Sequence, residues 1–215
     1  MKKLVIFDLD GTILNTISDI TFNVNLTMYK FGHKRLSEKK IRSLVGYGAA
    51  KLIKDSIKDP ISEEEFSKRL DFYNDLYTNS DSPKTVKFYG IDKLLTELKS
   101  RNIKIAILTN KPQPTTDEVY KRFLKDYDFD MVLGQSEKIK CKPSPEGAEL
   151  ILKTLGIDRV DALYVGDGEP DVLTAKNAGI DLVAALWGYR TKKILKATGA
   201  TNFAKTPRDV LRFLG

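Results

Sequence analysis

Residues 7–12 read Phe-Asp-Leu-Asp-Gly-Thr, and this stretch decides how the rest of the chain is interpreted. It continues the apolar run Leu4–Phe7, which predicts a short buried strand. Asp8 and Asp10 are two residues apart, so their side chains leave an extended backbone on the same side. Two neighbouring carboxylates repel each other, and a divalent cation would relieve that repulsion. Gly11 predicts a sharp turn that would bring the backbone close to a ligand. The alternative is a strand end with an ordinary polar turn, and the other strand ends decide between the two.

Four further apolar runs predict a sheet of five parallel strands. The runs contain almost no polar alternation, as expected for strands that are covered by helices on both faces. Helical periodicity lies between them, for example over residues 91–98. This alternation predicts a doubly wound, Rossmann-like α/β fold. The five expected strands are Leu4–Phe7, Ile103–Leu108, Phe129–Leu133, Ala162–Val165 and Leu182–Leu186.

The region that follows the first strand has a different pattern. Apolar residues at Ile20, Val24 and Met28 have helical spacing, and Ser62 with Glu65 predicts a capping box. The region is far too long for an ordinary connection between a strand and a helix. We therefore expect a helical cap domain at 15–84, inserted into a catalytic core made of 1–14 and 85–215. Such an insertion would lie above the carboxyl ends of the strands, where open α/β sheets bind ligands.

Composition and charge narrow the classes of protein to consider. The chain has 215 residues, 41% of them apolar, which suffices for a substantial core. Its single cysteine, Cys141, permits no disulfide within the chain, and the apolar run before Asp8 is too short to span a membrane. We therefore expect a soluble, cytoplasmic protein. The formal net charge is +7, but Lys51, Lys54 and Lys58 predict a solvated helix face rather than a nucleic-acid site, because no aromatic residues alternate with them.

The later strand ends carry polar residues that suit a phosphate and a metal. Thr109 and Asn110 follow the second strand and offer a hydroxyl and an amide. Lys142 comes after the third strand and just before a predicted helix, whose N-terminus favours anions. Asp167 and Asp171 follow the fourth strand. Because the carboxyl ends of parallel strands meet at one rim, we expect an oxygen-ligand Mg²⁺ site beside a phosphate site.

These residues resemble the four motifs of the haloacid dehalogenase superfamily of phosphohydrolases, in the order in which that family carries them. Asp8–Thr12 matches the first motif, Thr109 the second, Lys142 the third, and Gly166-Asp167 with Asp171 the fourth. The match extends along the whole predicted core, and the long insertion is similar to the family's helical cap. The resemblance implies a Mg²⁺-dependent phosphatase that acts on a small phosphorylated metabolite, with neither nucleic acid nor membrane as a partner.

The resemblance also implies a role for each matched residue. Asp8 would attack phosphorus and form an aspartyl phosphate. Asp10 would protonate the leaving alcohol and afterwards activate water. Thr109 and Lys142 would bind and balance the transferring phosphoryl group. Mg²⁺ would be bound by the carboxylates of Asp8 and Asp167 and by the backbone carbonyl of Asp10.

Two further residues are expected to act without touching the phosphoryl group. Asp171 would hold metal-bound water or orient Lys142 rather than bind the metal itself. Asn110 would support the site from its position beside Thr109. Both expectations follow from the resemblance and from the place of these residues at the strand ends.

Departures from related families narrow the reaction. A haloacid dehalogenase or a phosphonate-cleaving relative lacks an acid at the position of Asp10, and a sugar phosphomutase carries a histidine where this chain has Ile20. The segments Gly46–Leu52 and Trp187–Arg190 are similar to loops of phosphoglycolate phosphatases, which makes that subfamily the first hypothesis. The expected contacts to the leaving group are then Gly46, Gly48 and Lys51.

Three alternatives stay open at the level of sequence. The chain could be another capped phosphatase that acts on pyrophosphate, a nucleoside monophosphate or a sugar phosphate. It could be a sugar phosphomutase, or a basic binding module that retains an inactive phosphatase scaffold. The sequence fits a monomer or a homodimer equally well.

Overall fold

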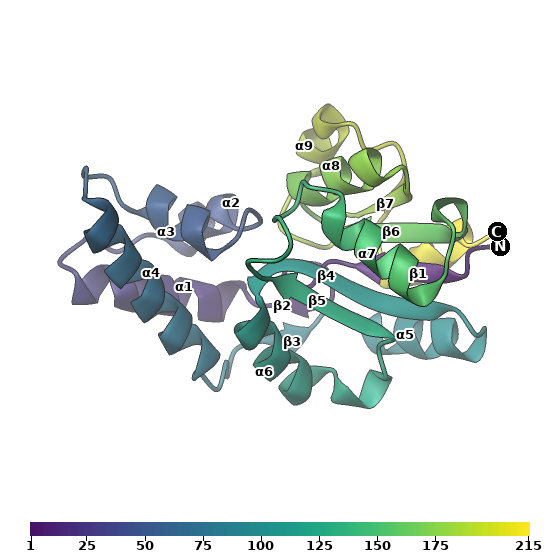
Figure 1. The fold of residues 1–215 in the computed structure, drawn as a ribbon, viewed down its shortest axis with the longest axis horizontal. Coiled ribbons are helices and arrows are strands. Elements are labelled where there is room, and N and C mark those ends of the chain that lie inside the picture. The colour runs from purple at the N-terminus through teal and green to yellow at the C-terminus, as the bar shows by residue number, and fades with distance from the viewer.

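The central sheet has six parallel strands in the order β5-β4-β1-β6-β7-β8 (Figure 1). The computed structural model describes residues 1–215. β4 and β5 lie on one side of β1, and β6, β7 and β8 lie on the other, so the strand order reverses at β1. Open α/β sheets bind ligands at the carboxyl ends of the strands where the order reverses. The strands are β1 (Leu4–Phe7), β4 (Lys104–Pro112), β5 (Met131–Gln135), β6 (Ala162–Gly166), β7 (Asp181–Ala185) and β8 (Phe203–Ala204).

The doubly wound α/β fold is confirmed, but the predicted number of five strands is wrong because β8 makes a sixth. β8 contains only Phe203 and Ala204, too few residues to form an apolar run. Its place is fixed by pairing with β7, where Ala204 lies opposite Ala185. The third predicted strand also begins at Met131 instead of Phe129.

Helices cover both faces of the sheet, and β1 contributes to the core on each face. Val5 and Phe7 belong to one hydrophobic cluster, whereas Leu4 and Ile6 belong to the cluster on the opposite face. Figure 1 shows α5 and α6 on the first side and α7 and α8 on the second. The strand that carries Asp8 is therefore fixed by packing from both sides. The helical elements of the core are α5 (Ile91–Ser100), α6 (Gln113–Phe123), α7 (Glu146–Leu155), α8 (Glu169–Ala178), α9 (Lys192–Thr198) and the 3-10 turns η1 (Lys125–Tyr127), η2 (Arg159–Asp161) and η3 (Pro207–Phe213).

Four helices lie beyond one end of the sheet, opposite the two chain termini (Figure 1). They pack around 11 buried hydrophobic residues, all between Ile17 and Tyr77, and so have a core of their own. Ser62 and Glu65 form the predicted capping box. No helix of the protein combines the length and hydrophobicity that a membrane span requires. We call these four the cap helices: α1 (Ile17–Lys30), α2 (Glu38–Leu44), α3 (Ala49–Ser56) and α4 (Glu63–Thr78).

The two chain segments that lead into and out of the cap helices are tied together. β2 (Leu14–Asn15) and β3 (Val86–Lys87) form a two-stranded antiparallel sheet. Beside it, the buried carboxylate of Asp19 accepts hydrogen bonds from the Lys84 amide at 3.1 Å and from the Thr85 hydroxyl at 2.7 Å. The entry and the exit of the cap helices are therefore fixed to each other.

Replacing Asp19 with Ala should lower the free energy of unfolding by about 2–3 kcal/mol, because the Lys84 amide and the Thr85 hydroxyl lose a charged, buried acceptor. Urea denaturation of the purified protein measures this. Asp81→Ala is the matched control, since Asp81 lies in the same connection with a side chain that is 93% exposed. We expect it to cost less than about 0.5 kcal/mol. Equal losses in the two variants would show that Asp19 does not join the two segments.

Candidate active site

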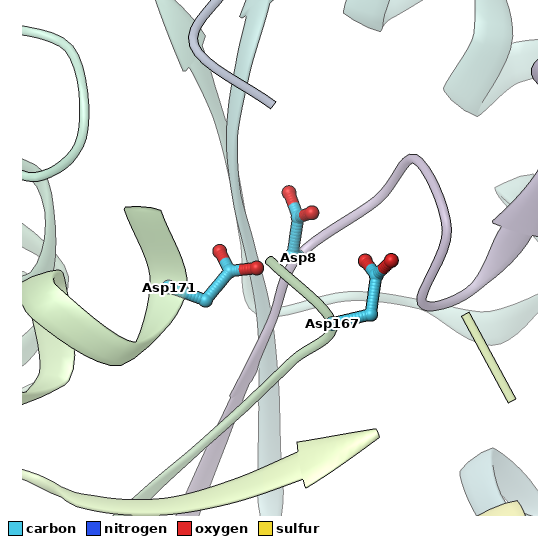
Figure 2. A group of neighbouring side chains, drawn as sticks. All are labelled: Asp8, Asp167 and Asp171. Atoms are coloured by element: carbon cyan, nitrogen blue, oxygen red, sulfur yellow. The ribbon is translucent and has the colours of Figure 1, made fainter. Parts of the chain in front are cut away.

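Three buried carboxylates converge at the carboxyl ends of β1 and β6 (Figure 2). Asp8 follows β1 directly, Asp167 follows β6, and Asp171 lies in the first turn of α8. Each side chain offers one oxygen, and these oxygens lie within 4.8 Å of one another. Because ionised carboxylates at such distances repel each other, this group requires positive charge nearby.

The ammonium group of Lys142 supplies part of that charge. Its Nζ donates to Asp8 Oδ1 at 2.7 Å and to Asp171 Oδ1 at 2.6 Å. Burial opposes the charge on Lys142, but Asp171 and Asp8 outweigh it and hold the lysine pKa well above its ordinary value. Asp171 also accepts from the Gly168 amide at 2.9 Å and from the Tyr164 hydroxyl at 3.3 Å. Asp171 is thus oriented by donors on both of its oxygens.

The other two carboxylates are less well compensated. Burial, together with Asp171, raises the pKa of Asp8 well above its ordinary value, although Lys142 opposes the shift. Burial and Asp171 also raise the pKa of Asp167 to about 7. The positive charge of Lys142 therefore does not neutralise the three carboxylates of Asp8, Asp167 and Asp171. The donor set consists of carboxylate oxygens without nitrogen or sulfur ligands, which fits a hard divalent cation such as Mg²⁺.

The turn after Asp8 brings the chain close to Asp167. Gly11 has φ +92°, and a Cβ atom there would lie only 2.5 Å from Asp167 Oδ2. The Thr12 hydroxyl donates to Asp167 Oδ1 at 3.0 Å, and the Tyr189 amide donates to Oδ2 at 2.6 Å. Only glycine permits this approach, so the sharp turn predicted after Asp8 also sets the position of the second acid.

Asp10 is not part of the three-carboxylate group and has partners of its own. Its Oδ1 accepts from the Thr16 hydroxyl at 2.7 Å, and its Oδ2 lies 3.3 Å from Lys111 Nζ. Asp8 and Asp10 nevertheless line the same cavity, which lies between the strand ends and the cap helices. The two acids of the first strand end thus have different surroundings, which suits them to different chemical roles.

Hydrogen bonds join the cap to the core beside the cavity. The Asn110 side chain donates to Gly46 O at 3.0 Å and to Lys142 O at 3.0 Å, and its Oδ1 accepts from the Lys142 amide at 2.7 Å. A second contact comes from Arg190, whose guanidinium donates to the carbonyls of Arg42 and Val45 and to Glu169. The loops that bear Lys142 and Gly46 are therefore held in one arrangement.

Comparison with known proteins identifies the family. The family model described as haloacid dehalogenase-like hydrolase matches residues 5–185. The chain belongs to this family. Phosphoglycolate phosphatase 1 of Pseudomonas aeruginosa is 30% identical over 216 residues, which cover 98% of this chain and 79% of that protein. The phosphoglycolate phosphatase of Psychrobacter arcticus is 30% identical over 208 residues, which cover 94% and 90%.

Solved structures agree with this assignment. A crystal structure from Lactobacillus delbrueckii subsp. bulgaricus covers 100% of this chain and 99% of its own with a TM-score of 0.91 and 28% identity. A haloacid dehalogenase-like family protein from Streptococcus pneumoniae shares the fold with a TM-score of 0.84 at 23% identity, covering 100% and 99%. The family and the relatives together identify this haloacid dehalogenase-like hydrolase as a phosphatase.

Most of the residues that the sequence selected in this hydrolase lie together. Asp8, Asp167, Asp171 and Lys142 form the connected group described above, while Thr109 and Asn110 line the cavity beside Asp8 and Asp10. In the cap, Gly46 and Gly48 line the same cavity.

Lys51 lies elsewhere. Its side chain is 54% exposed and pairs with Asp55 at 2.8 Å, and it is not among the residues that line the cavity. It sits on the outward face of α3, whereas Ala49 and Leu52 of the same helix face inward. The structure therefore does not bring Lys51 to the site for which the sequence selected it.

The sequence assigned no role to two basic residues that lie at the site. Lys111 is buried beside Asp10, and Arg190 joins the core to the cap. The position of Lys111 directly after Thr109 and Asn110, at a strand end, was an available signal. Arg190 binds mainly backbone carbonyls, and such contacts leave no pattern in the partner's side chains.

The contribution of Asp167 to the stability of the metal-free hydrolase should fall as the pH rises from about 4 to about 7. The pKa of Asp167 is raised to about 7 in the fold from an unfolded value of 3.8, so the folded state holds the extra proton within this window. Burial disfavours the ionised carboxylate of Asp167, so its ionisation lowers the stability of the folded state. Relative to Asp167→Asn, the melting temperature of the wild type in chelator should fall by at least about 3 °C across the window. A difference that stays constant with pH would contradict this.

Proposed function

We propose that this phosphatase hydrolyses small organic phosphate monoesters through a covalent aspartyl phosphate on Asp8, and that 2-phosphoglycolate is among its best substrates. The observation that carries the proposal is the buried Asp8 carboxylate at the floor of a cavity, held 2.7 Å from Lys142 Nζ. A carboxylate fixed in this way is oriented for attack, and the lysine can balance the charge of the incoming phosphoryl group. Thr109 lines the same cavity and would donate its hydroxyl to a phosphoryl oxygen.

Asp10 is the proposed general acid and base. It lines the cavity with Asp8 but has different neighbours, the Thr16 hydroxyl and Lys111. In the first half-reaction it would give a proton to the leaving oxygen as the P–O bond breaks. In the second it would take a proton from the water that hydrolyses the aspartyl phosphate, which restores both acids.

A Mg²⁺ ion would be held by the carboxylates of Asp8 and Asp167 and by the backbone carbonyl of Asp10. When bound, it would neutralise the negative charge shared by nucleophile and phosphoryl group. Asp171, whose oxygens already accept from Lys142, Tyr164 and Gly168, would orient Lys142 rather than bind the metal directly. Asn110 would hold the loop that carries Lys142.

Asp8→Asn should lower kcat by at least about 10⁴-fold with little change in melting temperature, because an amide cannot attack phosphorus. Asp10→Asn should slow both half-reactions and allow a phosphorylated enzyme to accumulate. Mass spectrometry after rapid quenching should then place the phosphate on Asp8. Residual activity of Asp8→Asn within about tenfold of the wild type, or an adduct on another residue, would contradict the covalent role.

Selection among phosphate esters is the task proposed for the cap, residues 15–84. The cavity measures about 50 Å³, and Gly46 and Gly48, which carry no side chain, are among the cap residues that line it. A small leaving group fits such a space. The two relatives named phosphoglycolate phosphatase, each 30% identical, support the same substrate class. Ile20 lines the cavity as well, so the cap presents an apolar side chain where a sugar phosphomutase would present histidine.

In a screen of phosphorylated metabolites with Mg²⁺, kcat/KM for 2-phosphoglycolate should exceed that for glycerol phosphates and nucleoside monophosphates by at least about tenfold. The closed cap leaves little room for a sugar or a base. Released inorganic phosphate measures each rate, and the same reactions in excess chelator are the control. Equal rates for nucleotides and 2-phosphoglycolate would overturn the substrate class but not the phosphatase assignment.

A further inference from the structure

Lys111 is a buried cation whose ammonium group makes no hydrogen bond within the protein. Its side chain is 3% exposed, and the nearest carboxylate oxygen, Asp10 Oδ2, lies 3.3 Å away. The other close neighbour is the ring of Tyr77, whose centroid is 3.9 Å from the Lys111 nitrogen. Lys142, by comparison, donates to two carboxylates at 2.6 and 2.7 Å. A buried ammonium group with unused donors is costly unless a further partner satisfies it.

The cap helix α4 places two more polar groups without partners around the same cavity. The Tyr77 hydroxyl and Asn74 Oδ1 are buried and have no hydrogen-bond partner. Residues three apart lie on one face of a helix, and both line the cavity together with Lys111. One ammonium, one hydroxyl and one amide from two different parts of the fold therefore surround a single space.

The charge of these groups indicates what they bind. An ammonium and a phenol hydroxyl both donate hydrogen bonds, so Lys111 and Tyr77 suit an anion. The unpartnered atom of Asn74 is its amide oxygen, an acceptor, and turning the amide over presents the nitrogen, a donor, to the same space. The proposed function already assigns Lys142 and Thr109 to the phosphoryl group. The groups around Lys111 lie beside Asp10, on the side where the leaving oxygen must receive its proton.

We infer that Lys111, Tyr77 and Asn74 form a subsite for a carboxylate carried by the leaving group. The inference rests on the proposed function and assigns to Lys111 the role that the sequence suggested for Lys51. A carboxylate one carbon from the ester oxygen stays close to Asp10 and therefore to Lys111. A carboxylate at the end of a longer chain does not, so the subsite selects phosphate esters of short 2-hydroxy acids.

Steady-state kinetics on two substrates of similar size tests this subsite. 2-Phosphoglycolate carries the carboxylate, whereas ethyl phosphate lacks it. Lys111→Met removes the charge and keeps the length of the side chain. We expect it to lower kcat/KM for 2-phosphoglycolate, mainly through KM, by about 30-fold more than for ethyl phosphate, because the loss of its contact with Asp10 affects both substrates alike whereas the loss of the subsite affects only the carboxylate. Lys54→Met, at an exposed lysine of α3, is the matched control and should change neither value.

Tyr77→Phe removes only one hydroxyl and provides a second, milder test. It should lower kcat/KM for 2-phosphoglycolate by about five- to tenfold and leave ethyl phosphate unchanged. It also keeps the test decisive if Lys111→Met does not fold, which the melting temperature of each variant shows. Equal losses on both substrates would mean that these residues act through Asp10 or the phosphoryl group, and would overturn the subsite. No loss on either substrate would overturn it as well.

Binding separates failure of the subsite from failure of the proposed function. Calorimetric titration of 2-phosphoglycolate into Asp8→Asn, with and without Lys111→Met, measures recognition without turnover. A loss of affinity of about 100-fold on adding Lys111→Met supports the subsite even if 2-phosphoglycolate proves a poor substrate. If the wild type hydrolyses 2-phosphoglycolate best but Asp8→Asn binds it equally well with and without Lys111→Met, the proposed function stands and the subsite is rejected.

Discussion

The ammonium group of Lys142, held between Asp8 and Asp171, is the interaction on which the site depends. Three acids are buried at the ends of parallel strands, and burial alone would favour their neutral forms. Lys142 opposes that tendency at Asp8 and is itself kept charged by its two partners. The fold makes this possible because the sheet buries β1 on both faces and leaves its carboxyl end to carry Asp8, the proposed nucleophile.

The cap and the core have different proposed tasks in the enzyme. In the proposed reaction, residues at the strand ends would contact the phosphoryl group, which every substrate has in common. The cap helices cover the remainder of the cavity and are joined to the core by Asn110 and Arg190 and by the paired linkers β2 and β3. Chemistry can therefore stay constant while the lining of the cap determines the leaving group.

The sequence indicated the candidate site residues that lie at strand ends. It was less informative about residues whose place in the site depends on which side chains are buried. Asp8, Asp167 and Lys142 could be selected because each follows an apolar run or precedes a helix. β8 could not be found, because two residues carry no periodicity. The likeness of Gly46–Leu52 to a cap loop of phosphoglycolate phosphatases drew attention to Lys51. The buried cation is Lys111 instead, and only the packing of α4 against the strand end shows which lysine lies inside the cavity.

The covalent role of Asp8 is the central claim, and the stereochemical course at phosphorus tests it most directly. A substrate whose phosphoryl group is made chiral with oxygen isotopes can be hydrolysed in isotopically labelled water and its product analysed by NMR. Transfer to Asp8 and then to water involves two displacements, each with inversion, so the account predicts net retention of configuration. Net inversion would mean that water attacks the substrate directly and would contradict the account.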